Sequence, residues 1–182
     1  MNKILSILIG LLSLLFVSCM ESDKSFIKKI KHMKNKNGET VEQLIDNYIV
    51  AAEFLQANKN SNIEKNISSV ALKIQEANNS KLDGNKEQIN ELSKLLATYQ
   101  INYPEIKNIN WKIISNSKAA KLIEVASDNI YLKLPIYKTK VNTAISFSNI
   151  EVYTTSNQPI DLNKLNAAHE VIEFIANENI LE

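Results

Sequence analysis

Arginine is absent from this sequence, in which all 21 basic residues are lysine. The planar guanidinium that holds a carboxylate or phosphate with two parallel hydrogen bonds is therefore unavailable. The lysines are balanced by 20 acidic residues, which gives a formal net charge of +1. A balance this close to neutral argues against a nucleic-acid partner, because such proteins carry an excess of positive charge.

Cysteine and glycine are also scarce. Cys19 is the sole cysteine, so no disulfide can form within the chain. The three glycines stand at positions 10, 38 and 84, too far apart for a glycine-rich loop around a phosphate. No serine lies in a nucleophile-elbow motif, and no pair of carboxylates is distinguished by its spacing. We therefore expect a protein that is not an enzyme, with no catalytic residue and no cofactor.

A long hydrophobic run is found close to the first residue. Residues 4–17 are almost entirely apolar; they follow Lys3 and end at Ser18 and Cys19. A charged start, an apolar middle and a small residue before a cut are typical of a secretory signal peptide. As a helix, the run would extend only ~21 Å, less than the ~30 Å hydrocarbon core of a bilayer. Its length favours a cleaved signal over a transmembrane helix.

The residues Phe16-Val17-Ser18-Cys19 resemble the lipobox of bacterial lipoproteins, Leu-(Ala/Ser/Val)-(Gly/Ala/Ser)-Cys. Val17, Ser18 and Cys19 match the motif, and Phe16 stands where leucine is usual. The resemblance covers about a tenth of the chain. It implies a lipoprotein signal peptide over residues 1–18 and a diacylglyceryl thioether on Cys19, with a further acyl group such as palmitate on the new N-terminus. The alternative is an ordinary signal peptide cut nearby, with Cys19 incidental.

The same resemblance implies a location. Two or more acyl chains hold a protein stably on a membrane, whereas one does so only marginally. The protein would then be lipid-anchored in the bacterial cell envelope, with membrane lipid as its partner through Cys19. Met20 is not acidic, so a retention signal of the enteric kind is not evident. We therefore expect the outer membrane in preference to the inner one.

Residues 19–38 are expected to form the lipidated cysteine and a basic tether. Apolar residues recur there at helical spacing among lysines, a pattern typical of a short amphipathic helix on anionic lipid. The predicted membrane-surface residues are Phe26, Ile27, Lys28, Lys29, Ile30 and Lys31. Two alternatives stay open: a solvated linker, or a first helix folded onto the domain.

Residues 39–182 are expected to form a single α+β domain, with three N-terminal helices, a four-stranded antiparallel meander and a C-terminal helix. Capping boxes at Thr40 with Gln43 and at Ser61 with Glu64 predict two helix starts. Three apolar stripes at helical spacing follow, over residues 41–55, 63–74 and 89–99. The opposite faces carry Glu, Gln, Lys and Asn, which we expect to be solvated.

The pattern changes to that of strands after Ile109. Four runs are predicted as strands: residues 111–115, 121–127, 130–138 and 143–155. Asp128-Asn129 predicts a two-residue hairpin turn. Pro135 cannot donate a ladder hydrogen bond, so it predicts an edge strand or a bulge. In the last run the apolar phase slips near Ser148-Asn149, which predicts either a bulge or a tight turn that splits the run in two.

Alternation along residues 130–138 places Tyr131, Lys133 and Tyr137 on one face of the sheet, which we expect to be partly open. The other face would pack on the helices. Asp161 is a good N-cap for the last helix. In that helix His169 and Glu173 could form half of a metal site. A second histidine is not nearby, so we expect His169 to be a partly buried boundary residue, and no metal site.

The sequence therefore predicts a cell-envelope lipoprotein with a non-catalytic interaction or structural role, contacting an envelope protein through the open sheet face. The alternative is a small binding module with an apolar-ligand pocket. It rests on the order of helices followed by a curved sheet, which resembles the NTF2-like fold at the level of architecture alone.

Overall fold

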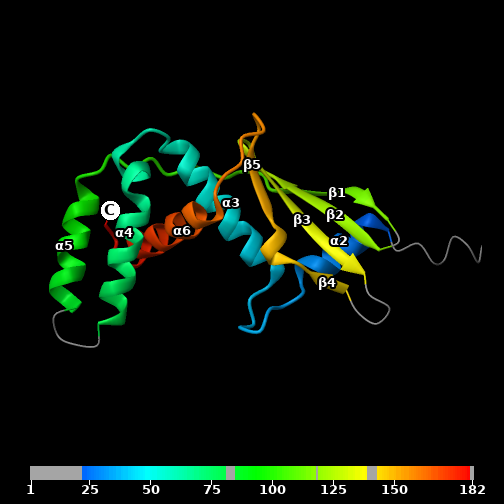
Figure 1. Cartoon of the computed structure of the whole chain (residues 1–182), viewed down its shortest axis with the longest axis horizontal. Coiled ribbons are helices and arrows are strands. Elements are labelled where there is room, and N and C mark those ends of the chain that lie inside the picture. Colours follow the sequence, from blue (N-terminus) through cyan, green and yellow to red (C-terminus); the bar gives the residue numbers. More distant parts are fainter. Residues whose placement is uncertain (1–21, 81–84, 118, 139–142, 181–182) are drawn as a thin grey trace, which may run out of the picture. The chain divides into compact units, whose positions relative to one another are not determined.

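The computed structural model describes residues 22–80, 85–117, 119–138 and 143–180. In that part of the chain it is an α+β structure with five α-helices and a five-stranded antiparallel sheet (Figure 1). The chain divides into two compact units, residues 1–42 and 43–182. The predicted signal peptide and Cys19 lie outside the described residues.

The first unit contains a helix, α2 (Asp23–Lys31), within the segment predicted as a tether. Ser22 caps its start, because the Ser22 hydroxyl accepts a hydrogen bond from the Ser25 N–H at 3.2 Å. Three lysines occupy its last turn, where they complement the negative end of the helix dipole.

A closed loop follows α2 in the same unit. The side-chain oxygen of Asn35 accepts from the N–H groups of Asn37 and Glu39 at 2.9 and 3.0 Å. Gly38 takes a positive φ of 87°, a conformation that glycine adopts without steric cost. Lys31 and Glu42 form an ion pair of 2.8 Å across the base of the loop. The predicted tether thus contains regular structure in its described part.

Four further helices are α3 (Val41–Ala57), α4 (Asn62–Asn79), α5 (Asn85–Ala97) and α6 (Leu162–Asn177). The predicted caps of α4 and α6 are confirmed. The Ser61 hydroxyl accepts from the Glu64 N–H at 3.3 Å, and the Asp161 carboxylate accepts from the Asn163 N–H at 2.6 Å. In the second unit α4 packs against both α5 and α6 (Figure 1).

The sheet consists of β1 (Asn110–Asn116), β2 (Ala120–Ala126), β3 (Ile130–Lys138), β4 (Thr143–Ile145) and β5 (Glu151–Thr154). β1, β2 and β3 are antiparallel neighbours in that order, and β3 pairs with both β4 and β5. The prediction of four strands was wrong in number, because a 3-10 turn over Phe147–Asn149 splits the last run. The split occurs where the apolar phase of the sequence slips.

The prediction that Pro135 marks an edge strand was wrong, since β3 has β2 on one side and both β4 and β5 on the other. β5 pairs with Ile130–Lys133 and β4 with Ile136–Lys138. Pro135 pairs with Leu122 of β2 and falls in the interval between the other two partners. A residue without an N–H is tolerated there because the neighbouring ladder is interrupted.

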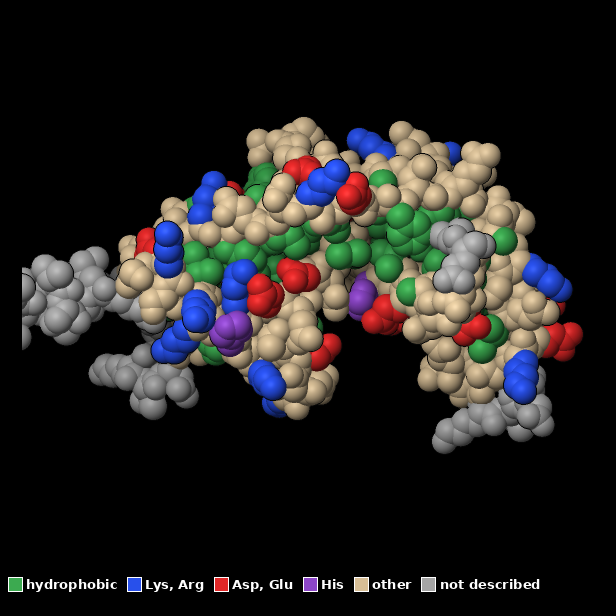
Figure 2. Space-filling view, turned by 180° about the vertical axis from the view of Figure 1, so that it is seen from behind, with side chains coloured by type: hydrophobic (Ala, Val, Ile, Leu, Met, Phe, Trp, Pro, Cys, Tyr) green, Lys and Arg blue, Asp and Glu red, His purple; other side chains and the backbone are tan. Residues whose placement is uncertain are grey.

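The two faces of the sheet differ as predicted. The inner face is buried and apolar; its side chains are Ile123, Val125, Ile130, Leu132, Leu134, Ile136 and Val152. Each such side chain contributes roughly 1.5–3 kcal/mol of transfer free energy. Tyr131 and Lys133 are half-buried on the other face, and Tyr137 is exposed. On the side of the molecule shown in Figure 2, lysine and acidic side chains are interspersed among uncharged ones.

Candidate functional site

The outer face of the sheet carries a row of four charges. The strand register places Lys112 of β1 beside Glu124 of β2, Glu124 beside Lys133 of β3, and Lys133 beside Glu151 of β5. Lys112 and Glu124 form an ion pair of 2.7 Å, and Lys133 and Glu151 one of 4.0 Å. The charges therefore alternate in sign across the whole width of the sheet.

These ion pairs contribute little to folding. The side chains at the two ends of the row, Lys112 and Glu151, are each 57% exposed, whereas those of Glu124 and Lys133 are 19% and 32% exposed. Ion pairs with an exposed member gain little, roughly 0–1 kcal/mol. The ends of the row are therefore accessible to another molecule, and its centre is partly buried.

Two tyrosines stack on the next row of the same face. The rings of Tyr131 on β3 and Tyr153 on β5 are cross-strand neighbours, with centroids 5.2 Å apart and planes 15° from parallel. The Lys133 ammonium lies 4.8 Å from the Tyr153 centroid and 5.8 Å from that of Tyr131. Cation–π attraction at such distances holds the lysine over the rings.

Hydrogen bonds fix both phenols. The Tyr131 hydroxyl donates to Asn157 Oδ1 at 2.6 Å, and the Tyr153 hydroxyl donates to Glu151 Oε2 at 3.0 Å. The bond to the Glu151 carboxylate raises the pKa of the Tyr153 phenol above its ordinary value of 10.0, and the negative charge of that carboxylate acts in the same direction. Both rings are therefore held in place before any partner binds.

We call this surface the open face. It is defined by Lys112, Glu124, Tyr131, Lys133, Glu151 and Tyr153. The sequence predicted that Tyr131 and Lys133 share a partly open face, and the structure confirms it. The alternating row could not be predicted in full, because it also depends on the registers of β1 with β2 and of β3 with β5, which no predicted tight turn sets.

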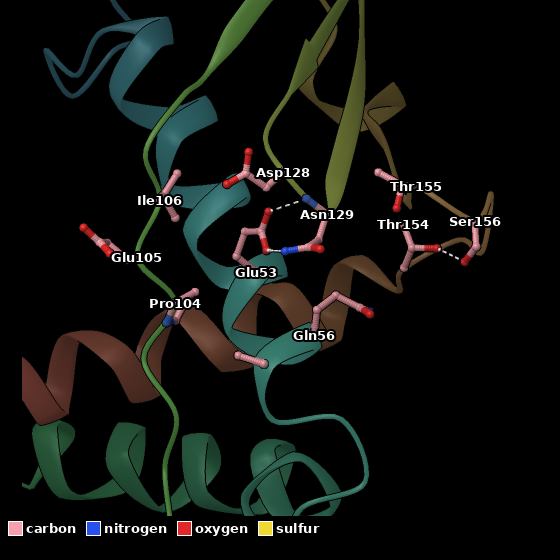
Figure 3. Close-up of a pocket in the computed structure, with 11 residues that line it drawn as sticks. Glu53, Gln56, Pro104, Glu105, Ile106, Asp128, Asn129, Thr154, Thr155 and Ser156 are labelled. Atoms are coloured by element: carbon pink, nitrogen blue, oxygen red, sulfur yellow. Dashed lines mark hydrogen bonds between the residues drawn. The ribbon is translucent and has the colours of Figure 1, made fainter.

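A polar hollow of about 410 Å³ lies beside the end of the sheet (Figure 3). It is bordered by the C-terminal half of α3, residues 104–106, the β2–β3 turn and the end of β5. Its polar lining includes Glu53, Gln56, Asp128, Asn129 and Thr154. The alternative interpretation from the sequence needs a pocket lined by Leu, Ile and Tyr, and this hollow has a different lining.

Glu53 in this hollow corrects a prediction, because the sequence predicted solvated polar faces on the helices. Glu53 is only 3% exposed. Its Oε1 accepts from the Ser127 hydroxyl at 2.5 Å and from the Asn129 N–H at 3.0 Å, and its Oε2 accepts from Asn129 Nδ2 at 3.0 Å. These three hydrogen bonds link α3 to the β2–β3 turn. Because the Glu53 carboxylate is used in them, its role in this structure is structural.

Asn58 is a second buried polar group that the sequence interpretation missed, at 1% exposed. Its Nδ2 donates to the carbonyls of Phe54 and Asn102, both at 2.8 Å, and its Oδ1 accepts from the Asn102 N–H at 2.9 Å. The Asn58 side-chain amide thus pairs with the Asn102 backbone in the way that a neighbouring β-strand would. It joins the end of α3 to the segment that leads into β1.

Two other hollows lie at the helices. One of about 210 Å³ lies between α4 and α5 and is lined by Lys73, Glu76, Gln88, Glu91, Leu92 and Leu95. The other, of about 600 Å³, has a mainly polar lining that includes Asn60, Ser61, Thr98 and Asn102. Both linings are again rich in polar side chains.

The predicted membrane-surface residues differ in exposure. Phe26 and Ile30 are buried, and Ile27 is half-buried. Lys28 and Lys29 are exposed. Lys31 is partly buried and paired with Glu42. Contact of this helix with lipid stays a prediction, and in this structure the lysines are the side chains available for it.

His169 is a boundary residue on α6, with its side chain 33% exposed and its Nε2 3.3 Å from Glu173 Oε1. Among the described residues, no three His, Cys, Asp or Glu side chains are grouped so that they could hold a metal ion. Within the same part of the chain, no helix has both the length and the apolar character needed to span a bilayer.

Comparisons with protein-family models, with curated proteins and with solved structures gave no match for this chain.

Proposed function

We propose that this protein is a bacterial cell-envelope lipoprotein, anchored through acylated Cys19, whose folded part acts by non-catalytic protein contact through the open face. The anchor is supported by the residues Val17-Ser18-Cys19 after an apolar run. Met20 supports placement in the outer membrane. The contact is supported by the geometry of the sheet.

The observation that carries the proposal is the stacked pair Tyr131 and Tyr153 beneath Lys133, bordered by alternating charges. Tyrosine is enriched at protein interfaces because it offers a large apolar ring and a polar end. Rings that are already fixed lose little conformational entropy on binding. A pre-ordered aromatic surface with polar surroundings is suited to a protein partner.

The anchor is tested by Cys19→Ala in the full chain. We expect the variant to leave the membrane fraction, or to accumulate unprocessed, because the acyl chains alone supply stable residence. Mass spectrometry of the mature N-terminus should show lipid on Cys19. A mature N-terminus elsewhere, or a bare thiol at Cys19, would contradict the anchor.

The contact is tested by photo-crosslinking in intact cells. A photoreactive side chain replaces Tyr137, an exposed aromatic residue on the same side of the sheet as the open face, or, as a control, Leu72 on α4. The two residues are 42% and 56% exposed. Neither substitution removes a residue that defines the open face. We expect a discrete protein adduct from position 137 that is not formed from position 72. Absence of an adduct at 137, or the same adducts from both positions, would contradict the proposal.

A further inference from the structure

The row of charges on the open face is complementary to itself when reversed. From β1 to β5 it reads plus, minus, plus, minus: Lys112, Glu124, Lys133, Glu151. A two-fold axis that runs along the strands, midway between β2 and β3, exchanges β1 with β5 and β2 with β3. It brings Lys112 opposite Glu151 of a second copy, and Glu124 opposite Lys133. All four cross-copy contacts then join opposite charges.

The side-chain sizes in the neighbouring row of residues are compatible with the same two-fold axis. It contains Asn110, Ala126, Tyr131 and Tyr153 in order from β1 to β5. The same exchange places each Tyr131 opposite an Ala126, and each Tyr153 opposite an Asn110. Large side chains therefore meet small ones, which is how packed sheet faces interdigitate. Charge and shape are separate observations, and both are satisfied by one axis.

From these two rows we infer that the occupant of the open face is a second copy of this chain, packed face to face as a two-fold dimer. The inference rests on the proposed function, because it names the partner of that contact. A two-fold interface uses the same patch on both copies, so the patch must complement itself. The alternating row and the adjacent large-and-small row meet this requirement.

The area of the face indicates a weak dimer. A seven-residue strand is ~23 Å long, and three strand spacings are ~14 Å wide, so each copy covers roughly 300 Å² in projection. Stable complexes bury about 800 Å² on each partner. Association is then expected chiefly where copies share one membrane, because tethering raises their effective concentration.

The test uses energy transfer between donor- and acceptor-labelled copies of the mature, lipidated chain in vesicles. The label is attached through Leu72→Cys on exposed α4. A second protein carries all four reversals, Lys112→Glu, Glu124→Lys, Lys133→Glu and Glu151→Lys. This swapped chain keeps its net charge and each cross-strand pair, and circular dichroism checks that it is folded.

The swapped row reads minus, plus, minus, plus, so it also complements itself but repels the original row. We expect transfer above the random level among original copies and among swapped copies. Energy transfer between original and swapped copies should fall to the random level, because we expect their association to be weakened roughly ten-fold or more. Random transfer among original copies, or equal transfer in the mixture, would overturn the dimer.

The crosslinking experiment separates the two proposals. Random transfer together with a discrete adduct to a different protein at position 137 would show that the partner is not a second copy, while contact through the open face stands. Random transfer with no adduct at position 137 would remove both.

Discussion

Glu53 and Asn129 lie 76 residues apart in the sequence and are joined by two hydrogen bonds of 3.0 Å, one to the backbone N–H and one to the side-chain amide of Asn129. This pair links the C-terminal half of α3 to the β2–β3 turn. It therefore sets the position of the hairpin whose outer side carries Glu124, Tyr131 and Lys133.

Substitution of Glu53 should destabilise the fold. In Glu53→Gln one acceptor oxygen becomes an amide N–H₂, which then faces a donor of Ser127 or Asn129. Leaving a buried donor unpaired costs about 1–3 kcal/mol. Urea denaturation should show a loss of that size, whereas Glu76→Gln on the exposed face of α4 should change the free energy of unfolding by less than about 0.5 kcal/mol. Equal changes in the free energy of unfolding for the two substitutions would show that the Glu53 carboxylate does not stabilise the attachment of α3 to the β2–β3 turn.

Asn58 should be still less tolerant of substitution. Asn58→Ala removes three hydrogen bonds and leaves the N–H and carbonyl of Asn102 without their partner. We expect a loss of about 2–4 kcal/mol in the free energy of unfolding. The matched control is Asn66→Ala, since the Asn66 amide also donates to the carbonyl four residues earlier but is exposed. A loss below 1 kcal/mol for Asn58→Ala would refute this role.

The Tyr153 phenol should lose its proton at a higher pH than an ordinary tyrosine does. Its pKa is raised by the hydrogen bond to Glu151, so the folded protein binds this proton more tightly than the unfolded chain does. The resulting stabilisation is present below pH ~10 and is lost as the pH rises through the folded pKa. The phenolate absorbance of Glu151→Gln should therefore develop at lower pH than that of the original protein. Tyr137→Phe serves as the control, because Tyr137 is paired with Ala120 and Ala144 and its substitution leaves the Tyr153–Glu151 bond intact. An unchanged titration in Glu151→Gln would contradict this assignment.

The exposed lysines of α2 should promote contact with anionic lipid. We compare mature chains that carry Cys19→Ala, so that no acyl group masks the effect. Lys28→Gln with Lys29→Gln should weaken binding to vesicles of anionic phospholipid by about 2 kcal/mol, at ~1 kcal/mol per lysine. Lys65→Gln with Lys73→Gln, two exposed sites on α4, should have a smaller effect. If neutral vesicles bind the chain equally well, the lysines do not direct it to the membrane.

Local sequence signals located most of the elements. Ser61 and Asp161 were predicted as helix caps, and Asp128-Asn129 as a turn, because each depends only on residues within a few positions. Of the two alternatives predicted for Pro135, an edge strand or a bulge, the edge strand was wrong, because the tolerance of a proline depends on which strands lie alongside. The sequence alone does not show that β3 has two short partners on one side.

Contacts between distant residues were not predictable in the same way. Glu53 lies within an apolar stretch of α3, and a charged residue there is the one sequence signal that a buried partner exists. The strand run 143–155 was recognised as irregular, but its division changed the strand count. The alternating row on the open face required the register of four strands, which no local pattern contains.

The most direct test of the central claim is lysine-reactive footprinting of the full chain in native membranes, compared with the dilute purified protein. We predict that Lys112 and Lys133 react more slowly in the membranes because a partner covers the open face, while Lys65 and Lys73 on α4 react equally in both. Unchanged reactivity of Lys112 and Lys133 would contradict the claim that this face is a contact surface.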